Sequence, residues 1–306
     1  MIDNHPLIAV VGPTGAGKSE IALRLAAIFN GEIVNCDSVQ VYEGLEIGSA
    51  KIRASERRGI PHHLLDVVPP MGEMTAGDYA RDATVVLAGI KERSALPIVV
   101  GGTGFYLRAL LDGLSPAPTR NAKLRERLAG LAARRPAALH RFLKKCDAGA
   151  AERIHPNDHQ KLMRAIEMGG NGKEARQGLR GFRVLKIGLN PDRTKLYERL
   201  NRRSEWMFAN GLVEETQALL ASGVPANAKA LGTLGYKQAV AKVQQRMSLE
   251  EAIAECQLLT RHYAKRQLTW FRGEAEMNWL SGFGDEEGVQ AAAQGLVSAF
   301  LAATSV

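Results

Sequence analysis

The first hundred residues alternate between short apolar runs and longer segments whose apolar positions recur with a helical period. This pattern predicts strands at 7–11, 32–35 and 96–100, and helices at 17–29 and 78–92. Strands that alternate with helices are typical of an α/β fold, in which a parallel sheet carries helices on both faces. Ligands of such sheets bind at the carboxyl ends of the strands. We therefore expect the chemistry in the loops that follow these three strands.

The alternation stops at the proline-containing stretch 115–118, and helical, basic segments follow at about 121–168. Further elements of the core are expected after them. They are a strand at 182–189, helices at 192–210, 212–222 and 249–271, a last strand at 277–280 and a terminal helix. We therefore predict one core formed by residues 1–117 and 182–306, which a helical insertion at 118–181 interrupts.

The first predicted strand leads directly into a loop that fits the pattern G-x-x-x-x-G-K-[ST], formed by Gly12, Pro13, Thr14, Gly15, Ala16, Gly17, Lys18 and Ser19. Glycines let the backbone curl so that successive N–H groups point at phosphate oxygens. Lys18 adds a positive charge, and the Ser19 hydroxyl can hold Mg²⁺ beside the helix N-terminus. A simple glycine-rich turn is the alternative, and the flanking strand and helix disfavour it. The loop predicts a P-loop core that binds a polyphosphate or a pyrophosphate ester.

Asp37 follows the second predicted strand directly, across the sheet from this loop. A carboxylate in this place can coordinate Mg²⁺ or act as a base toward an acceptor. The structural alternative is a helix N-cap or a turn aspartate, which is the more common role of an Asp-Ser pair. The position at the end of a strand favours the functional interpretation.

A third loop, formed by Gly101, Gly102, Thr103 and Gly104, follows the strand at 96–100. Small residues here let a ligand approach the backbone closely, and Thr103 offers a hydroxyl. The signal is weak by itself, since a strand-to-helix turn often contains glycine. No aspartate ends this strand, as a Walker B aspartate does in many ATPases, which counts against a motor or switch protein.

Composition narrows the class of protein further. The apolar share of 45% and the charged share of 24% are those of an ordinary globular protein. Three widely spaced cysteines, Cys36, Cys146 and Cys256, argue against a disulfide framework or a zinc site and favour a reducing compartment. The apolar runs are too short to cross a bilayer, and no secretory signal is visible. We therefore expect a cytoplasmic protein without a membrane partner.

The net charge of +8 is unevenly distributed. Residues 119–203 contain 22 lysines and arginines against 8 acidic residues, a net charge of +14, so the rest of the chain carries −6. A basic segment on an otherwise mildly acidic protein is typical of a nucleic-acid partner. A solvated helical surface that happens to be basic explains the same charge equally well.

Within the insertion, Asp158 is a plausible N-cap for a helix in which Leu162 and Ile166 face inward. Gln160 and Arg164 share a different face, with Lys161 beside them. A polar, basic helix face suits contacts with the phosphates or bases of RNA. The spacing alone fits a solvated face just as well.

In this order, the motifs resemble those of the tRNA dimethylallyltransferases, also called tRNA isopentenyltransferases, over almost the whole chain. The resemblance rests on the loop 12–19 together with Asp37-Ser38-Val39-Gln40-Val41-Tyr42, Ile47-Gly48-Ser49-Ala50-Lys51, His62-His63-Leu64-Leu65-Asp66, Gly101-Gly102-Thr103-Gly104-Phe105-Tyr106, Arg153-Ile154-His155-Pro156-Asn157-Asp158, Gly235-Tyr236-Lys237 and Lys265-Arg266-Gln267-Leu268-Thr269-Trp270-Phe271-Arg272. Each motif is modest, but the combination is highly specific.

The resemblance implies transfer of a dimethylallyl group from dimethylallyl diphosphate to N6 of the adenine immediately 3′ of the anticodon. The loop 12–19 would hold the diphosphate, and Mg²⁺ would lie near Ser19. From its place in the predicted helix at 192–210, Arg203 is expected to help bind the diphosphate. Lys18 would take up the charge of the leaving diphosphate, Asp37 would be the general base for the N6 proton, and Thr103 would hold the base or the substrate.

The resemblance also implies where tRNA is bound. Ser38 and Gln40 would touch the flipped adenine, in one tRNA-binding segment with Asp37 and the intervening Val39. The anticodon arm would be contacted by Arg125 and by the helix segment Gln160, Lys161, Leu162, Met163 and Arg164. The glycine-rich stretch 167–173 departs from the family pattern. The expected partners are tRNA and dimethylallyl diphosphate, with no obligate protein partner and a monomeric state.

Two other functions share parts of this pattern. A small-molecule or nucleotide kinase of the same fold would use Asp37 to activate a hydroxyl acceptor, but it has no need of the basic insertion. A non-catalytic RNA-binding protein would use the loop 12–19 only to sense a nucleotide, and the convergence of Asp37 and Gly101–Gly104 on that loop argues against it.

Overall fold

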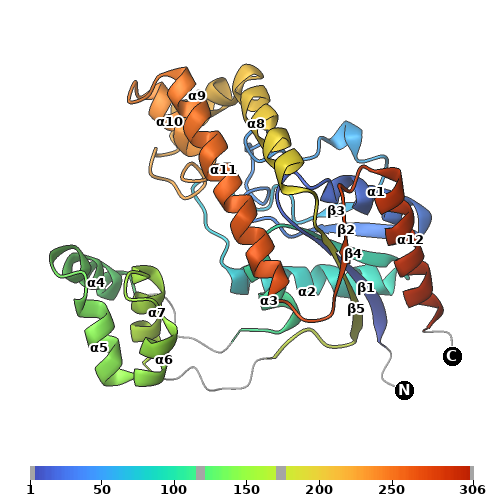
Figure 1. Ribbon diagram of the computed structural model, residues 1–306, viewed down its shortest axis with the longest axis horizontal. Helices are drawn as coiled ribbons and strands as arrows, with labels where there is room; N and C mark the ends of the chain where they lie inside the picture. Colours follow the sequence, from blue (N-terminus) through green and yellow to red (C-terminus); the bar gives the residue numbers. More distant parts are fainter. Residues whose placement is uncertain (1–3, 115–120, 170–176, 304–306) are drawn as a thin grey trace. The chain divides into compact units, whose positions relative to one another are not determined.

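The computed structural model describes residues 4–114, 121–169 and 177–303, and the chain forms two compact units (Figure 1). The larger unit comprises Met1–Leu111 and Leu179–Val306, and the smaller unit comprises Asp112–Gly178. The smaller unit therefore begins before residue 118, where we expected the insertion to begin, and ends before residue 181. The proline-containing stretch 115–118 and most of the glycine-rich stretch 167–173 lie outside the described residues.

The larger unit is built on a parallel sheet whose strands, among the described residues, lie in the order β3-β2-β4-β1-β5-β6. Every pairing in it is parallel. The carboxyl ends of all strands therefore meet at one edge, as an α/β fold requires. The strands are β1 (His5–Val11), β2 (Gly31–Asn35), β3 (His62–His63), β4 (Leu96–Gly101), β5 (Phe182–Leu189) and β6 (Met277–Leu280).

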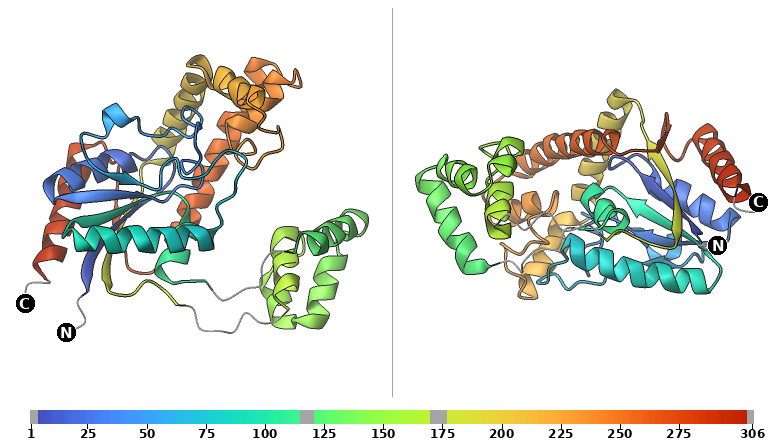
Figure 2. Two further views of the ribbon diagram at one scale, coloured as in Figure 1. Left: turned by 180° about the vertical axis from the view of Figure 1, so that it is seen from behind. Right: turned by 90° about the horizontal axis from the view of Figure 1, so that it is seen from below.

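Strand β1 lies at the centre of the larger unit and is buried on both faces. Leu7 and Ala9 pack into one apolar cluster with helix α2 (Ala76–Glu92). Ile8 and Val10 pack into a second cluster with helices α1 (Lys18–Ile28) and α12 (Glu287–Ala302). Because successive side chains of a strand point to opposite faces, a strand covered on both faces must be apolar throughout. Figure 2 shows these helices on either side of the sheet.

Four helices extend beyond the carboxyl edge of the sheet (Figure 1). They are α8 (Arg193–Ala209), α9 (Leu212–Ala221), α10 (Tyr236–Val243) and α11 (Leu249–Arg272), and α11 packs along α8. Helices α8, α9 and α11 are close to their predicted bounds, whereas α10, β3 and the 3₁₀ turn η1 (Ala54–Glu56) were not predicted. Helix α3 (Gly104–Leu111) follows β4 directly. In the described part of the chain, no helix has the length and apolar character needed to span a bilayer.

The smaller unit is helical, as predicted, with its own apolar core. Three of its helices begin at a side-chain cap, because Asn121, Asp147 and Asp158 each accept a hydrogen bond from a backbone N–H of the first turn. The predicted N-cap at Asp158 is thus confirmed. Its described helices are α4 (Ala122–Arg134), α5 (Ala138–Cys146), α6 (Ala148–Arg153) and α7 (His159–Met168), and their shared core includes Leu128, Leu139, Leu143 and Leu162.

Candidate active site

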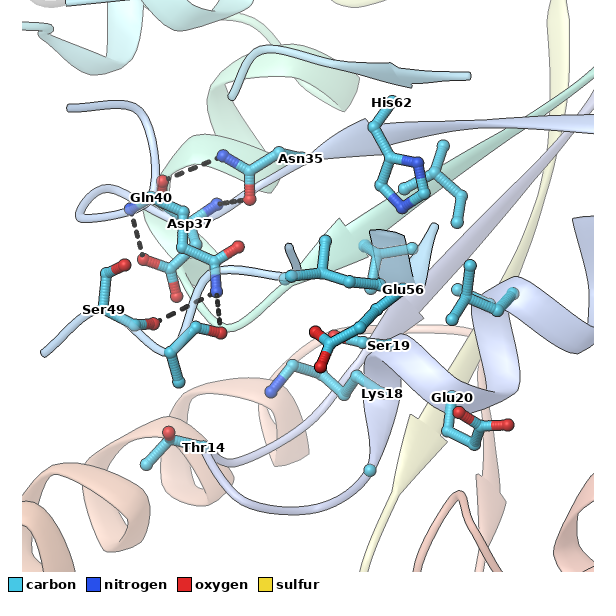
Figure 3. A pocket seen from close by; sticks show the side chains of 18 of the residues that line it. Thr14, Lys18, Ser19, Glu20, Asn35, Asp37, Gln40, Ser49, Glu56 and His62 are labelled. Carbon is cyan, nitrogen blue, oxygen red and sulfur yellow. Dashed lines mark hydrogen bonds between the residues drawn. The ribbon is translucent and has the colours of Figure 1, made fainter. Parts of the chain in front are cut away.

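The loop between β1 and α1 has the open, curled backbone that binds phosphate. Gly12, Gly15 and Gly17 all have positive φ angles, of 149°, 77° and 83°, which residues with a side chain rarely adopt. The Lys18 amine folds back over the loop and donates a hydrogen bond to the Pro13 carbonyl at 2.8 Å. Figure 3 shows its amine on the side of the cavity that carries Asp37. The loop is therefore shaped for an anion before any ligand arrives.

Lys18 is partly buried, and burial lowers its pKa to about 8. The desolvation of the charged amine is the main cause, the nearby Asp37 carboxylate opposes it, and the Arg203 guanidinium adds to it. The lowered pKa shows that the charge of Asp37 does not fully offset the cost of burying the Lys18 amine. Binding an anionic phosphate would supply further negative charge.

Asp37 forms the sharp turn that follows β2. Its Oδ1 accepts hydrogen bonds from the N–H of Val39 at 2.8 Å and of Gln40 at 3.4 Å, while its own N–H donates to Asn35 Oδ1 at 3.1 Å. The turn aspartate that we considered as the structural alternative is therefore present. The turn role does not exclude the functional interpretation, because the described turn hydrogen bonds use Oδ1 and the carboxylate also lines the two cavities described below.

Thr103 joins the loop after β4 to the loop after β2. Its Oγ1 accepts a hydrogen bond from Ser38 N–H at 3.0 Å and lies 3.3 Å from Ser38 Oγ, and its own N–H donates to the Cys36 carbonyl at 3.2 Å. These contacts follow from the pairing of β2 with β4, which places the two loops side by side.

The glycines beside Thr103 also serve the packing of the chain itself. A Cβ at Gly101 would overlap with the Cys36 carbonyl, one at Gly102 with the Gln267 amide, and one at Gly104 with the Trp270 ring. They let helix α11 and the β2 loop pack directly on the backbone. Gly101 also lines the loop cavity described below, so the expectation that a ligand approaches the backbone here stays a prediction.

Two cavities meet at this edge of the sheet. The first, which we call the loop cavity, measures about 540 Å³ and is lined by the phosphate-binding loop, including Lys18 and Ser19. The second, the helix cavity, measures about 280 Å³ and is lined by residues of α8, α11 and the segment 232–235. Both are lined by Thr14, Asp37, Ser49 and Arg203. A ligand in one cavity is therefore next to a ligand in the other, with the Asp37 carboxylate at the junction.

Arg203 of α8 supplies a second cation at this junction. Its Nη1 donates to Thr14 Oγ1 at 3.3 Å, and burial lowers the pKa of its guanidinium while Asp37 opposes that effect. The prediction that Arg203 belongs to the phosphate site came from its place in the sequence alone, and the structure brings it to the loop.

The three residues after Asp37 line different cavities. Ser38 and Val39 line the helix cavity. Gln40 lines the loop cavity instead, and its amide donates to the carbonyls of Ser49 and Ala50 at 3.2 Å, as Figure 3 shows. Gln40 thus holds the wall of the site that contains Ser49.

The comparisons with known proteins agree with this geometry. Residues 40–274 match the model of the IPP transferase family. The chain belongs to the IPP transferase family. It is 51% identical to the tRNA dimethylallyltransferase of Solibacter usitatus over 97% of this chain and 99% of that protein. It is 52% identical to the tRNA dimethylallyltransferase of Koribacter versatilis, over 92% and 95% of the two chains.

Solved structures of IPP transferases resemble the fold as well. The full-length tRNA isopentenylpyrophosphate transferase of Bacillus halodurans aligns with a TM-score of 0.76 at 34% identity, covering 99% of this chain and 98% of that one. A eukaryotic dimethylallyltransferase whose structures capture it acting on tRNA aligns with a TM-score of 0.77 at 27% identity, covering 91% and 74%. The family resemblance expected from the motifs is thus confirmed.

This IPP transferase offers few protein ligands to a metal ion. Among the described residues there is no group of three His, Cys, Asp or Glu side chains that could hold one. The Ser19 hydroxyl is exposed at the start of α1 and lines the loop cavity together with Asp37. Mg²⁺ commonly keeps several waters and takes its other ligands from substrate phosphates. The residues present therefore fit Mg²⁺ only as a partner of a bound diphosphate.

In the smaller unit of this IPP transferase, the predicted RNA-binding residues fall into two groups. Gln160 and Lys161 are exposed, and Lys161 pairs with Asp158 at 2.8 Å. Leu162 and Met163 are 0% and 7% exposed and pack in the core of the unit. The side chains of these two residues are therefore not available to RNA, because they hold α7 on its neighbours.

Arg125 and Arg164 both contact one carboxylate. Arg125 makes two hydrogen bonds with Glu167, at 2.7 Å and 3.0 Å, and Arg164 makes one at 3.2 Å. Both guanidinium groups lower the pKa of Glu167, chiefly through the hydrogen bond from Arg125. The shared carboxylate orients the two arginines side by side between α4 and α7. This pairing was not predicted. The half-buried Tyr263 and the buried Gln267 of α11 were not predicted as site residues either, although the motif 265–272 marked that helix.

Proposed function

We propose that this protein is a tRNA dimethylallyltransferase, which transfers the dimethylallyl group of dimethylallyl diphosphate to N6 of the adenine immediately 3′ of the anticodon. The observation that carries the proposal is the junction of the two cavities at Asp37. The diphosphate lies in the loop cavity and the adenine enters from the helix cavity. The family membership and the names of the relatives support this choice of donor and acceptor.

The donor is held by its diphosphate. Backbone N–H groups of the loop 12–19 and the amine of Lys18 bind the phosphate oxygens, and Arg203 reaches the same site from α8. When bound beside Ser19, Mg²⁺ neutralises part of the charge that develops on the leaving diphosphate. These fixed positive groups favour the breaking of the C–O bond because the leaving group gains charge as it departs.

The acceptor needs a base. N6 of adenine is a weak nucleophile because its lone pair is delocalised into the ring. As the new C–N bond forms, the electron pair of the C–O bond leaves with diphosphate and N6 becomes acidic. Asp37 takes the N6 proton, and Thr103 and Ser38 fix the loop that carries it. The bound substrates have to keep water from the electron-poor allylic carbon.

The acceptor adenine has to leave its stack to reach Asp37, because a stacked adenine within the anticodon loop is not otherwise accessible to a carboxylate that lies inside a cavity. We propose that the basic smaller unit holds the anticodon arm while this happens. Exposed Gln160 and Lys161, with the paired Arg125 and Arg164, supply its contacts with RNA. We propose that the protein acts in the cytoplasm, where it meets its tRNA substrate.

Transfer of label to tRNA tests the proposal. The protein is incubated with Mg²⁺, labelled dimethylallyl diphosphate and unmodified tRNA, and a tRNA with guanine in place of the target adenine is the control. We expect label in the first tRNA and none in the second. Turnover of ATP without any label in tRNA would identify the kinase, and RNA binding without label or ATP turnover would identify the non-catalytic RNA-binding protein.

A further inference from the structure

Gln267 of helix α11 connects two loops of the active site beyond the point where their strands stop pairing. The last pair between β1 and β4 is Val11 with Gly101. Past this pair, Gln267 Oε1 accepts a hydrogen bond from Thr14 N–H at 2.8 Å, and its Nε2 donates to the Gly102 carbonyl at 2.8 Å. The side chain is 5% exposed. One buried amide therefore holds the phosphate-binding loop and the Thr103 loop at a fixed separation.

Each end of this bridge leads to one of the two substrates. Thr14 accepts a hydrogen bond from Arg203 on the diphosphate side. Gly102 precedes Thr103, whose Oγ1 accepts from the N–H of Ser38 on the acceptor side. Gln267 itself is not among the residues that line either cavity. The bridge therefore joins the two binding loops without touching the ligands.

We propose that Gln267 is a positioning residue for prenyl transfer, which sets the distance between the donor carbon on the phosphate-binding loop and the acceptor nitrogen beside Asp37. The inference rests on the proposed function, since it concerns the same two substrates. A group that fixes the relative position of two bound reactants acts on the rate of their reaction, and a small misplacement costs up to about a hundredfold in that rate. It does not act on the affinity of either reactant taken alone.

The local structure is specific for a glutamine. The bridge needs a hydrogen-bond acceptor and a donor on one side chain, which glutamine and asparagine offer and an ionised glutamate does not. Asparagine is one methylene shorter. The absence of a Cβ at Gly102 is what admits the amide, because a Cβ there would overlap with Nε2. Gly102 and Gln267 thus form a matched pair.

Three variants test the role. Gln267→Leu removes both hydrogen bonds at similar volume, and Gln267→Glu keeps the acceptor but places a carboxylate oxygen against the Gly102 carbonyl. Gln257→Leu is the matched control on the same helix, because its amide bonds Glu205 and Asn201, neither of which lines a cavity. Steady-state transfer to tRNA gives kcat and the KM of each substrate, and thermal unfolding confirms that each variant is folded at the assay temperature.

We expect kcat to fall by about a hundredfold in Gln267→Leu, with both KM values within about twofold of wild type, and no change of kcat in Gln257→Leu. In Gln267→Glu, lowering the pH protonates the buried carboxyl, whose pKa burial raises, and restores a donor toward Gly102. The ratio of its kcat to that of wild type should therefore rise as the pH falls. Taking the ratio removes the pH dependence that both proteins share, such as that of Lys18, whose neighbouring charges are Asp37 and Arg203.

Two results overturn the inference while leaving the proposed function standing. One is a wild-type kcat in Gln267→Leu. The other is a loss of transfer in Gln267→Leu that appears only as a raised KM, because it would show that the bridge shapes a binding surface. Absence of transfer by the wild-type protein is a different result, and it overturns the proposed function itself.

Discussion

The lowered pKa of Lys18 predicts a specific pH dependence of donor binding. In the free protein burial lowers the pKa of Lys18 from 10.5 to about 8, so its amine loses its charge above about pH 8. A bound diphosphate places negative charge beside the amine and raises this pKa again. Binding then takes up a proton above pH 8, and the affinity for dimethylallyl diphosphate falls as the pH rises.

The size of the effect follows from the two pKa values. If the bound diphosphate returns the pKa of Lys18 to its ordinary value of 10.5, the affinity falls about thirtyfold between pH 7 and pH 9.5. Other groups contribute little in this range. A terminal phosphate completes its ionisation near pH 6, Arg203 stays charged, and burial raises the pKa of the Cys36 thiol to about 12.

Titration calorimetry with dimethylallyl diphosphate, without tRNA or Mg²⁺, measures this affinity. Repeating it in buffers of different ionisation enthalpy counts the protons taken up. Lys18→Met is the control, and its weaker binding should not change over the same pH range. An affinity of the wild-type protein that stays constant from pH 7 to pH 9.5, with no proton uptake, refutes the reasoning.

The contribution of Lys18 to stability cannot explain a fall in donor affinity between pH 8 and pH 9.5. The native protein binds fewer protons than the unfolded chain between pH 8 and 10.5, because the folded pKa of Lys18 is the lower one. For this group the free energy of unfolding therefore rises with pH through that window. Protein stability and donor affinity are expected to change in opposite directions, and circular dichroism at pH 9.5 verifies that the fold persists.

Three further predictions concern the base, the packing of the loops and the RNA contact. Asp37→Asn keeps the Oδ1 acceptor of the turn but cannot take a proton. The rate of single-turnover transfer should therefore fall by about 10² to 10⁴, while the affinity for tRNA stays unchanged. A loss of rate below tenfold would contradict the base assignment. Gly101→Ala forces a Cβ onto the Cys36 carbonyl and should lower the free energy of unfolding by about 3 kcal/mol in a denaturant titration. Gly295→Ala, at an open position of α12, is the control and should raise the free energy of unfolding by about 0.5–1 kcal/mol. Raising salt should weaken tRNA binding steeply through the release of counterions, less so in Lys161→Ala, and a binding constant insensitive to salt would exclude the basic unit as the contact.

Local sequence was sufficient for the parts of the site that are built from neighbouring residues. The loop 12–19 needs glycines and a following helix in a fixed order, so the sequence alone predicts a phosphate-binding loop there. The sheet was predictable for the same reason, because each buried strand is a continuous apolar run between turn residues. The short strand β3 was missed, because two residues carry no recognisable period.

Predictions that depended on the partner of a side chain fared less well. Leu162 and Met163 belong to a motif that suggested RNA, yet both are buried, because the helix has to place its apolar face on α4 and α5. The glycines of the Thr103 loop pointed to a ligand, yet a Cβ at Gly102 or Gly104 would overlap with α11, and one at Gly101 would overlap with the β2 loop. The helical spacing had already placed Leu162 inward, but for Met163 and these glycines only the packing showed which neighbours they contact.

The sequence by itself thus determined the phosphate-binding loop, the parallel sheet and the family, since each rests on residues that are close along the chain. Only the tertiary structure placed Gln267 at the loop, 253 positions after Thr14. It also showed that Arg203, which was expected at the diphosphate, contacts Thr14 across 189 positions. Only the tertiary structure showed that Asp37 both closes a turn and faces two cavities. Contacts between distant segments depend on how whole helices pack, and no local pattern encodes that arrangement.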